Sequence, residues 1–279
     1  MKTLIFGSIL TVISWILAWG RVEPFYEYSF FPLWIGYIIT INGLSYWLFG
    51  RSLLSRMGKS FLILFLISIP LWWFFEFLNL FTHNWHYIFP RQIGQFEYFV
   101  RASISFSTVI PAVLSTAFLF YNILARIKHL RWVKFPLSQP ALFTIFGLGV
   151  LSFLLIFVTP YLSFPFMWLG LFLMFEPLNY SLKFSSILRE VNRGKYTLFV
   201  AIGVATLFTG FWWEMWNFYS LPKWTYLIPY VGYFKIFEMP ILGFLGYPFF
   251  GLEVYSFTNF MFGVLRKVFK LEFLKLSLA

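Results

Sequence analysis

Eight long apolar stretches dominate this 279-residue sequence, in which only 11% of the residues are charged. A helix needs roughly 20 mostly apolar residues to cross the hydrocarbon core of a bilayer. The backbone finds no water there, so a spanning segment must satisfy its own hydrogen bonds as a helix. The sequence therefore predicts an all-α polytopic membrane protein with about eight transmembrane helices. The expected spans cover about 3–19, 32–49, 60–82, 99–124, 141–159, 163–182, 197–219 and 239–263.

The first stretch has two interpretations. Lys2 precedes an apolar run, which is also the pattern of a secretory signal peptide. The run is long for a signal peptide, and it has a counterpart at the head of the second half of the chain. We therefore expect a helix.

The 21 Lys and Arg residues are distributed unevenly among the loops. Sixteen lie at the N-terminus, after the second, fourth and sixth spans, and in the C-terminal tail, which includes Lys275. The other five are Arg21, Arg91, Arg101, Lys223 and Lys235. Basic residues collect on the cytoplasmic side of a membrane, so both termini are predicted to be cytoplasmic, in the cytoplasmic membrane of a prokaryote. The net charge of +11 then predicts contacts with anionic lipid headgroups at these loops and no nucleic-acid partner.

A polar motif occurs twice in the sequence. Each copy contains Glu-x-x-Asn at the end of an apolar run, followed by Trp-x-Tyr and then Pro. The first copy contains Glu76, Asn79, Trp85 and Tyr87, and the second contains Glu214, Asn217, Trp224 and Tyr226. Further pairs, such as Gly94 with Gly232, extend the similarity at offsets that drift from 134 to 139. The chain is therefore predicted to contain two tandem four-helix repeats, residues 1–135 and 136–279. An even number of spans in each gives them parallel orientation.

Carboxylates within the apolar stretches are the candidate catalytic residues, because charged side chains in a bilayer are costly and mark functional sites. The candidates are Glu214, Glu238 and Glu253, and Glu176 is a further candidate for binding substrate. The first half has Val100, Thr116 and Asn42 where the second half has Glu238, Glu253 and Glu176. The second half thus carries most of these acids, which predicts one site there and a structural role for the copy with Glu76, Asn79, Trp85 and Tyr87. The alternative is that the carboxylates only fix helix packing through hydrogen bonds.

Aromatic residues make up 25% of the chain. They predict either belts at the membrane interfaces or a cavity whose ring faces stabilise a cationic intermediate. The candidate substrate contacts are Trp213, Asn217, Trp224, Tyr226, Tyr247 and Glu176. His83 and His86 have a spacing that suits a metal, but the second copy lacks both His residues, so no metal is predicted. No cofactor is predicted either.

The second half resembles the membrane lycopene-cyclase domain over roughly residues 210–255, with an echo at 72–116. The resemblance rests on Glu214, Trp224-Thr225-Tyr226, Gly232, Glu238-Met239-Pro240 and the run from Pro248 to Glu253. The chain departs from that family because its first acid is Glu instead of Asp and it lacks the tandem Pro-x-Glu-Glu/Asp. Each repeat also has four expected spans instead of three. The resemblance implies carotenoid biosynthesis, with a carotenoid or other isoprenoid as substrate and isomerase chemistry.

The sequence is compatible with three functions. The first is a membrane enzyme that acts on an isoprenoid, carotenoid or lipid by acid catalysis from an intramembrane Glu. The second is a proton-coupled transporter or lipid-translocating protein, and the third is a non-catalytic scaffold. Convergence of Glu176, Glu214, Glu238 and Glu253 on one cavity would favour a site built from these acids. The oligomeric state is left open.

Overall fold

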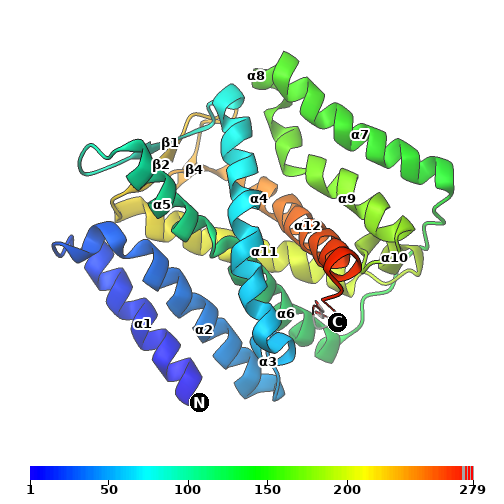
Figure 1. Cartoon of the computed structure of the whole chain (residues 1–279), viewed down its shortest axis with the longest axis horizontal. Helices are drawn as coiled ribbons and strands as arrows, with labels where there is room; N and C mark the ends of the chain where they lie inside the picture. The colour runs from blue at the N-terminus through cyan, green and yellow to red at the C-terminus, as the bar shows by residue number, and fades with distance from the viewer. Residues whose placement is uncertain (272–273, 275, 277, 279) are drawn as a thin grey trace.

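The computed structural model describes residues 1–271, 274, 276 and 278, and the chain is mostly helical (Figure 1). Its α-helices are α1 Lys2–Trp19, α2 Phe30–Phe49, α3 Leu53–Met57, α4 Phe61–Thr82, α5 Gln95–Phe106, α6 Val109–Ile127, α7 Gln139–Val158, α8 Pro160–Ser163, α9 Gly170–Ser181, α10 Ile187–Asn192, α11 Thr197–Tyr219 and α12 Gly246–Phe269. The 3₁₀ turns are η1 Phe25–Tyr28, η2 Gly58–Ser60, η3 Phe164–Trp168 and η4 Ile241–Leu245, and the strands are β1 Trp85–Ile88, β2 Lys223–Tyr226, β3 Lys235–Ile236 and β4 Met239–Pro240. Lys275 of the basic tail lies outside the described residues.

Several helices have the length and composition of membrane spans. Among the described residues, five stretches qualify: Lys2–Trp19, Leu53–Thr82, Gln95–Ile127, Gln139–Val158 and Thr197–Tyr219. Pro160–Trp168 and Gly170–Ser181, bent by 41°, make a sixth if the pair is one span. Helices α2 and α12 occupy the two remaining expected stretches, and polar residues such as Asn42 and Glu253 make them less apolar. The structure is therefore consistent with a location in a membrane.

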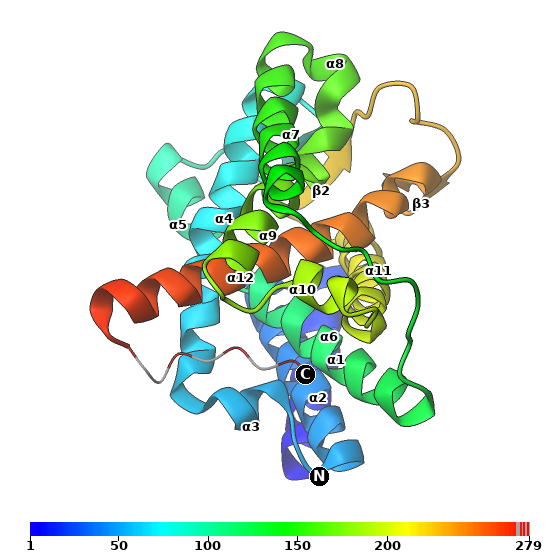
Figure 2. The ribbon, with the colours of Figure 1, turned by 90° about the vertical axis from the view of Figure 1, so that its right-hand side faces the viewer.

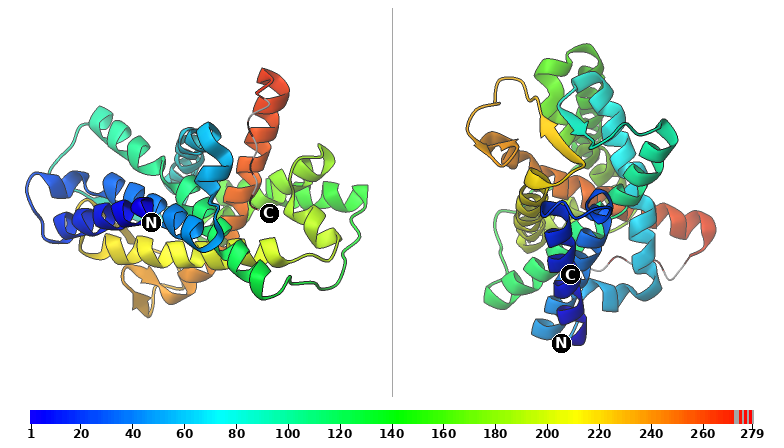
Figure 3. Two further views of the ribbon diagram at one scale, coloured as in Figure 1. Left: turned by 90° about the horizontal axis from the view of Figure 1, so that it is seen from below. Right: turned by 90° about the vertical axis from the view of Figure 1, so that its left-hand side faces the viewer.

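The helices of the two halves pack in corresponding pairs. Helix α1 packs on α2 and α2 on α6, just as α7 packs on α9 and α9 on α12. The pairs α1–α2 and α7–α9 lie at opposite ends of the molecule, with α4, α6, α11 and α12 between them (Figures 1 and 3). Helix α12 crosses the middle of the molecule (Figure 2), and α6 packs along α11. The buried apolar side chains of α2, α4, α6, α11 and α12 belong to one core.

Glycines allow the close approach of the paired helices at each end. A Cβ atom on Gly36 of α2 would lie 2.6 Å from the backbone nitrogen of Thr11 in α1. The corresponding Gly170, at the start of α9, faces the Phe153 ring of α7, where a Cβ would lie 2.5 Å from the ring. Small residues at such contacts let helix axes approach closely, which favours van der Waals packing in lipid.

Two short antiparallel ribbons are present that the all-helical prediction did not include. Strand β1 belongs to the first copy of the motif and β2 to the second, and they pair with each other. Trp85 lies opposite Tyr226 and Tyr87 lies opposite Trp224, so each Trp faces the Tyr of the other copy. The register is thus symmetric with respect to the two halves. Strands β3 and β4 form a small hairpin after β2.

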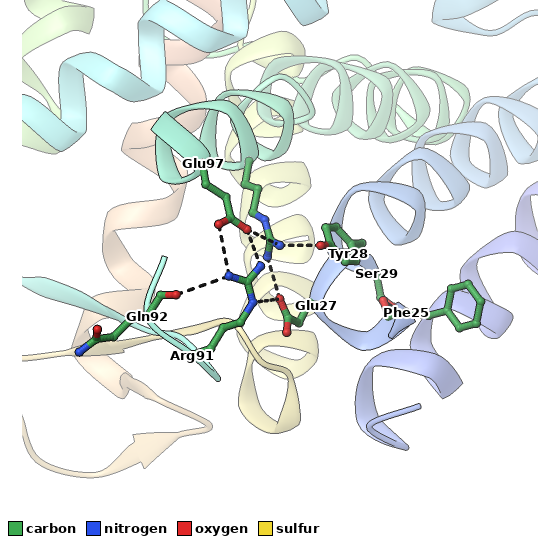
Figure 4. A network of polar contacts seen from close by, with 8 residues as sticks. Phe25, Glu27, Tyr28, Ser29, Arg91, Gln92 and Glu97 are labelled. Carbon is green, nitrogen blue, oxygen red and sulfur yellow. Dashed lines mark hydrogen bonds and ion pairs between the residues drawn. The ribbon is translucent and has the colours of Figure 1, made fainter. Parts of the chain in front are cut away.

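A network of charged residues ties α5 to the turn η1 (Figure 4). The Arg101 guanidinium lies 2.9 Å from the Glu27 carboxylate and 2.6 Å from that of Glu97. Arg91 bridges the same two carboxylates at 3.4 and 2.5 Å. Arg101 also lies over the Tyr28 ring, with its guanidinium carbon 4.3 Å from the ring centroid. The two positive and two negative charges therefore neutralise one another at this end of the cavity described below.

Candidate functional site

An aromatic cavity of about 570 Å³ lies where β1 and β2 join the two halves. Ligand pockets for small molecules typically have volumes of this order. Side chains from both copies of the motif line it: Trp72, Trp85 and Tyr87 from the first, and Trp213, Trp224, Tyr226 and Tyr247 from the second. Phe106, Trp168 and Phe250 complete much of the wall. The predicted contacts Trp213, Trp224, Tyr226 and Tyr247 therefore do share one cavity. Trp85 and Tyr87, which were predicted to be only structural, line it too.

The first copy holds its carboxylate with three hydrogen-bond donors. Glu76 Oε1 accepts hydrogen bonds from the indole N–H groups of Trp72 at 3.0 Å and Trp85 at 3.1 Å, and from the Tyr87 hydroxyl at 2.6 Å. All three donors line the cavity, whereas Glu76 lies behind them. Two of its three donors are therefore indoles.

The second copy holds its carboxylate with two phenols. Glu214 Oε1 accepts hydrogen bonds from the hydroxyls of Tyr226 at 2.7 Å and Tyr247 at 2.6 Å. The Trp224 indole donates to the Tyr226 hydroxyl at 2.8 Å. Glu214 is fully buried, and among the described residues its Oε2 has no hydrogen-bond partner and its carboxylate no ion pair. A buried carboxylate thus lies directly behind two cavity-lining hydroxyls.

The two asparagines have the same role in both copies. Asn79 donates from Nδ2 to the Trp85 carbonyl at 2.8 Å and accepts at Oδ1 from the Trp85 N–H at 3.2 Å. Asn217 makes the same two bonds to the backbone of Trp224, at 2.7 and 2.8 Å. Asn217 was predicted to contact substrate, but its side chain is used to hold the strand and does not line the cavity.

A coordinated exchange of side chains accounts for the different donors. Four residues before its glutamate, the first copy has Trp72 and the second has Gly210. Directly before the shared proline of the last helix, the first half has Ile110 and the second has Tyr247. A Cβ on Gly210 would lie 2.6 Å from the Tyr247 ring. The missing side chain in α11 therefore makes the space through which Tyr247 of α12 reaches the carboxylate.

The strand tyrosines remain neutral donors over the ordinary pH range. Burial raises the pKa of Tyr226 well above its usual value of 10, and the nearby Glu214 carboxylate raises it further. Burial and the Glu76 carboxylate raise the pKa of Tyr87 in the same way. Both hydroxyls can therefore donate to their carboxylates wherever the protein is folded near neutral pH.

Glu238 lies beside the cavity in an ion pair. Its carboxylate contacts the Lys223 ammonium, which also donates to the Phe218 carbonyl at 3.3 Å. Lys223 lines the cavity and Glu238 does not. The pair fastens β2 to the segment that precedes β4, so the predicted catalytic acid Glu238 neutralises a lysine at the cavity wall.

Glu253 caps a helix away from the cavity. Its Oε1 accepts a hydrogen bond at 2.9 Å from the backbone N–H of Leu171, in the first turn of α9. The second half is bent between η3 and α9, whereas α2 is continuous in the first half. The break leaves backbone N–H groups without helical partners, and a carboxylate at a helix N-terminus is favourable. The position predicted as catalytic therefore stabilises this break.

Glu176 has the role that the Asn42 amide has in the first half, because each accepts a hydrogen bond from a backbone N–H at the start of a short helix. Its Oε2 accepts hydrogen bonds from the Ser186 hydroxyl at 2.7 Å and from the N–H of Leu188 at 3.1 Å, at the start of α10. The corresponding Asn42 accepts from the N–H of Leu54 at 2.8 Å, at the start of α3. Glu176 does not line the cavity. The four carboxylates do not converge on one cavity, and only Glu214 and Glu238 are bonded to residues that line it.

The two histidines of the first copy lie on different elements. His83 ends α4 in a left-handed conformation with φ of 51°, and His86 lies in β1. Within the described part of the chain, no group of three or more His, Cys, Asp or Glu side chains could hold a metal ion.

No family model, no curated protein and no solved structure matches the chain. What the protein does is therefore inferred from the chemistry of the cavity and of the groups bonded to its wall.

Proposed function

We propose that this protein is an integral membrane enzyme that binds an apolar isoprenoid in the aromatic cavity and acts on it by proton transfer from Glu214. The observation that carries the proposal is the pair of cavity-lining hydroxyls, from Tyr226 and Tyr247, on a fully buried carboxylate. Proton transfer by a positioned side chain contributes about 10²–10⁴-fold to a rate. The carboxylate supplies the acid, and the hydroxyls connect it with the cavity.

The walls of the cavity favour an uncharged substrate. Its basic lining residues, Arg101 and Lys223, are already paired with Glu27 and Glu238. The remaining wall is largely aromatic, and such ring faces stabilise a passing positive charge. A polyene or isoprenoid chain that becomes cationic on protonation suits these surroundings. The resemblance to the membrane lycopene-cyclase domain leads to the same substrate class, with carotenoid cyclisation or isomerisation as the reaction.

The membrane arrangement we propose has eight spans in two tandem four-helix repeats, residues 1–135 and 136–279, with parallel orientation. It is supported by the matching helix pairs and by the symmetric register of β1 and β2. Both termini would face the cytoplasm of a prokaryote, and the basic loops would contact anionic headgroups.

The positions of the carboxylates favour catalysis over the two alternatives. A proton-coupled transporter would use acids along a path through the membrane, but Glu176 and Glu253 are bonded to helix starts. A scaffold would need no cavity, whereas aromatic rings of both halves surround one here.

The decisive experiment compares Glu214→Gln with Glu76→Gln. Each purified protein is incubated in detergent with acyclic isoprenoids, lycopene first, and products are separated by chromatography. Glu214→Gln should lose about 100-fold or more of the turnover, because Gln accepts the same hydrogen bonds and carries no acid proton. Glu76→Gln should stay within a few-fold of the wild type. Equal turnover by Glu214→Gln and wild type would refute the assignment, provided that both proteins elute as the same single species.

A further inference from the structure

The Glu214 carboxylate cannot itself touch a molecule in the cavity. It is fully buried and does not line the wall. A proton can therefore pass between this carboxylate and the cavity only through a neighbouring group. Two hydroxyls are in position, those of Tyr226 and Tyr247.

The two hydroxyls differ in what else they bind. A hydroxyl has one proton to donate and two lone pairs that accept. Tyr226 donates to Glu214 and accepts from the Trp224 indole at 2.8 Å, so it is held from both sides. Tyr247 donates to Glu214 at 2.6 Å, and no indole or amide among the described residues donates to it. Tyr226 still has one acceptor position, but the Trp224 indole fixes its orientation, whereas the Tyr247 oxygen has only the Tyr226 hydroxyl as a further polar neighbour among the described residues. The Tyr247 hydroxyl is therefore the freer of the two to turn, on a side chain that lines the cavity.

The first copy has one hydroxyl on its carboxylate, that of Tyr87, which corresponds to Tyr226, and it has none at the position of Tyr247. There Trp72 supplies the donor, and an indole N–H donates without being able to accept. Ile110, at the position of Tyr247, carries no polar atom. The exchange of Trp72 and Ile110 for Gly210 and Tyr247 thus replaces a group that can only hold a carboxylate with one that can also pass a proton.

We infer that the hydroxyl of Tyr247 is the proton relay between Glu214 and the substrate, and that Tyr226 positions the carboxylate. The inference rests on the proposed function and adds the group that touches the substrate. When Glu214 is protonated, its carboxyl donates to the Tyr247 oxygen, the reverse of the bond in the structure, and the Tyr247 hydroxyl turns its proton toward the cavity. In the forward step the Tyr247 O–H bond breaks as its proton adds to a substrate carbon. The Glu214 proton transfers to the Tyr247 oxygen at the same time. Glu214 is left as the carboxylate, and loss of a proton from the cationic product reverses both transfers.

The test follows the carboxyl group itself and does not need a substrate. The C=O stretch of protonated Glu214 is followed by infrared spectroscopy on the full-length protein in detergent and is identified by its disappearance in Glu214→Gln. Transfer into D₂O then gives its exchange rate. Tyr247→Phe should slow this exchange about 100-fold, the scale on which a positioned proton-transfer group acts. Tyr226→Phe, the matched control, should change it by no more than a few-fold.

A double variant, Gly210→Trp with Tyr247→Ile, installs the first copy's pair in the second half and should slow exchange as Tyr247→Phe does. Exchange at the wild-type rate in Tyr247→Phe, with unchanged elution and thermal unfolding, would overturn the relay. So would the absence of any Glu214-dependent carboxyl band at every pH, since a group that never holds a proton cannot pass one on.

The outcomes separate the two proposals. Loss of turnover in Glu214→Gln together with normal exchange in Tyr247→Phe would reject Tyr247 as the relay and leave Glu214 as the catalytic acid. Slow exchange in Tyr247→Phe with full turnover in Glu214→Gln would show a proton path from Glu214 to the cavity through Tyr247 and would reject a catalytic role for both residues.

Discussion

Glu76 and Glu214 occupy corresponding positions, yet the parts around them have diverged to different degrees. Asn79 and Asn217 bind the following strand through the same pair of backbone atoms. The donors to the two carboxylates differ in number and in kind. A backbone N–H and C=O can be satisfied together only by a group that both accepts and donates, so the amide is tightly constrained. A carboxylate accepts from any nearby donor, and its neighbours are free to change. The two copies of the motif therefore share the frame, in which an asparagine holds the following strand, and differ in the donors to the carboxylate.

The largest expected effect tests whether the frame is shared. Asn217→Ala leaves the N–H and C=O of Trp224 unpaired, and an unpaired buried polar group costs about 1–3 kcal/mol. We expect a loss of about 2–4 kcal/mol in the free energy of unfolding, and a similar loss for Asn79→Ala, measured by denaturation in detergent. Ser220→Ala, which removes a single bond to the Trp216 carbonyl, is the control for loss of one polar group near the same helix end. A large loss in one asparagine variant alone would show that the frames are unequal.

A smaller expected effect tests whether the absence of a side chain at Gly210 makes room for the Tyr247 ring. Gly210→Ala places a Cβ 2.6 Å from the Tyr247 ring, and overpacking of this kind costs about 1–3 kcal/mol. Gly203 lies in the same helix, where a Cβ would meet Pro248 at an ordinary 3.5 Å. Gly203→Ala should therefore be neutral or stabilising by up to about 1 kcal/mol, because alanine favours a helix over glycine. Thermal unfolding compares the two variants, and equal destabilisation would contradict the close contact at Gly210.

The smallest expected effect tests whether the hydroxyls of Tyr87 and Tyr226 have similar surroundings. Burial, with Glu76 or Glu214 nearby, raises the pKa of both hydroxyls above 10 in the folded protein. The unfolded chain releases these protons first as pH rises, so stability is complete below about pH 10 and falls above it. Each tyrosine should contribute a loss of about 1 kcal/mol over the first pH unit above 10.

Tyr87→Phe and Tyr226→Phe should each make this alkaline loss shallower by the same amount in unfolding measured against pH. Tyr233→Phe, at an exposed position, is the control for the loss of one tyrosine hydroxyl. A slope altered by only one of the two buried variants would show that their surroundings differ.

The sequence was sufficient to locate the helices, because apolar stretches of membrane length have few other solutions. Each expected span contains a helix, although the stretch at 99–124 is divided between α5 and α6 and the stretch at 163–182 between η3 and α9. The stretch at 239–263 begins in β4 and η4, and its helix starts only at Gly246. Among the described residues, at most six stretches qualify as membrane spans. The pairing of β1 with β2 could not be foreseen. Trp-x-Tyr is too short to carry a strand period, and its partner lies in the other half. The repeat showed that the two segments correspond but not that they touch.

The candidate acids could be predicted only in part. A carboxylate in an apolar stretch can either cap a helix or take part in chemistry. The sequence around Glu176 and Glu253 therefore does not distinguish them from Glu214. One signal was present, since the counterpart of Glu176 is Asn42, an amide suited to binding backbone. The sequence carries a second signal. The paired change from Trp72 and Ile110 to Gly210 and Tyr247 is visible in the two repeats and would have singled out Tyr247.

The ribbon of β1 and β2 also has a consequence for biosynthesis. Trp85 and Tyr226 are adjacent in space but far apart along the chain, so β1 leaves the ribosome long before its partner exists. Until β2 arrives, β1 has a free edge, which can pair with other chains. The cavity wall is likewise incomplete, and contacts between distant segments form slowly. The cavity is therefore complete only after the second half of the chain has been made, and the packing of α12, which carries Tyr247 and Phe250, is the step that closes its wall.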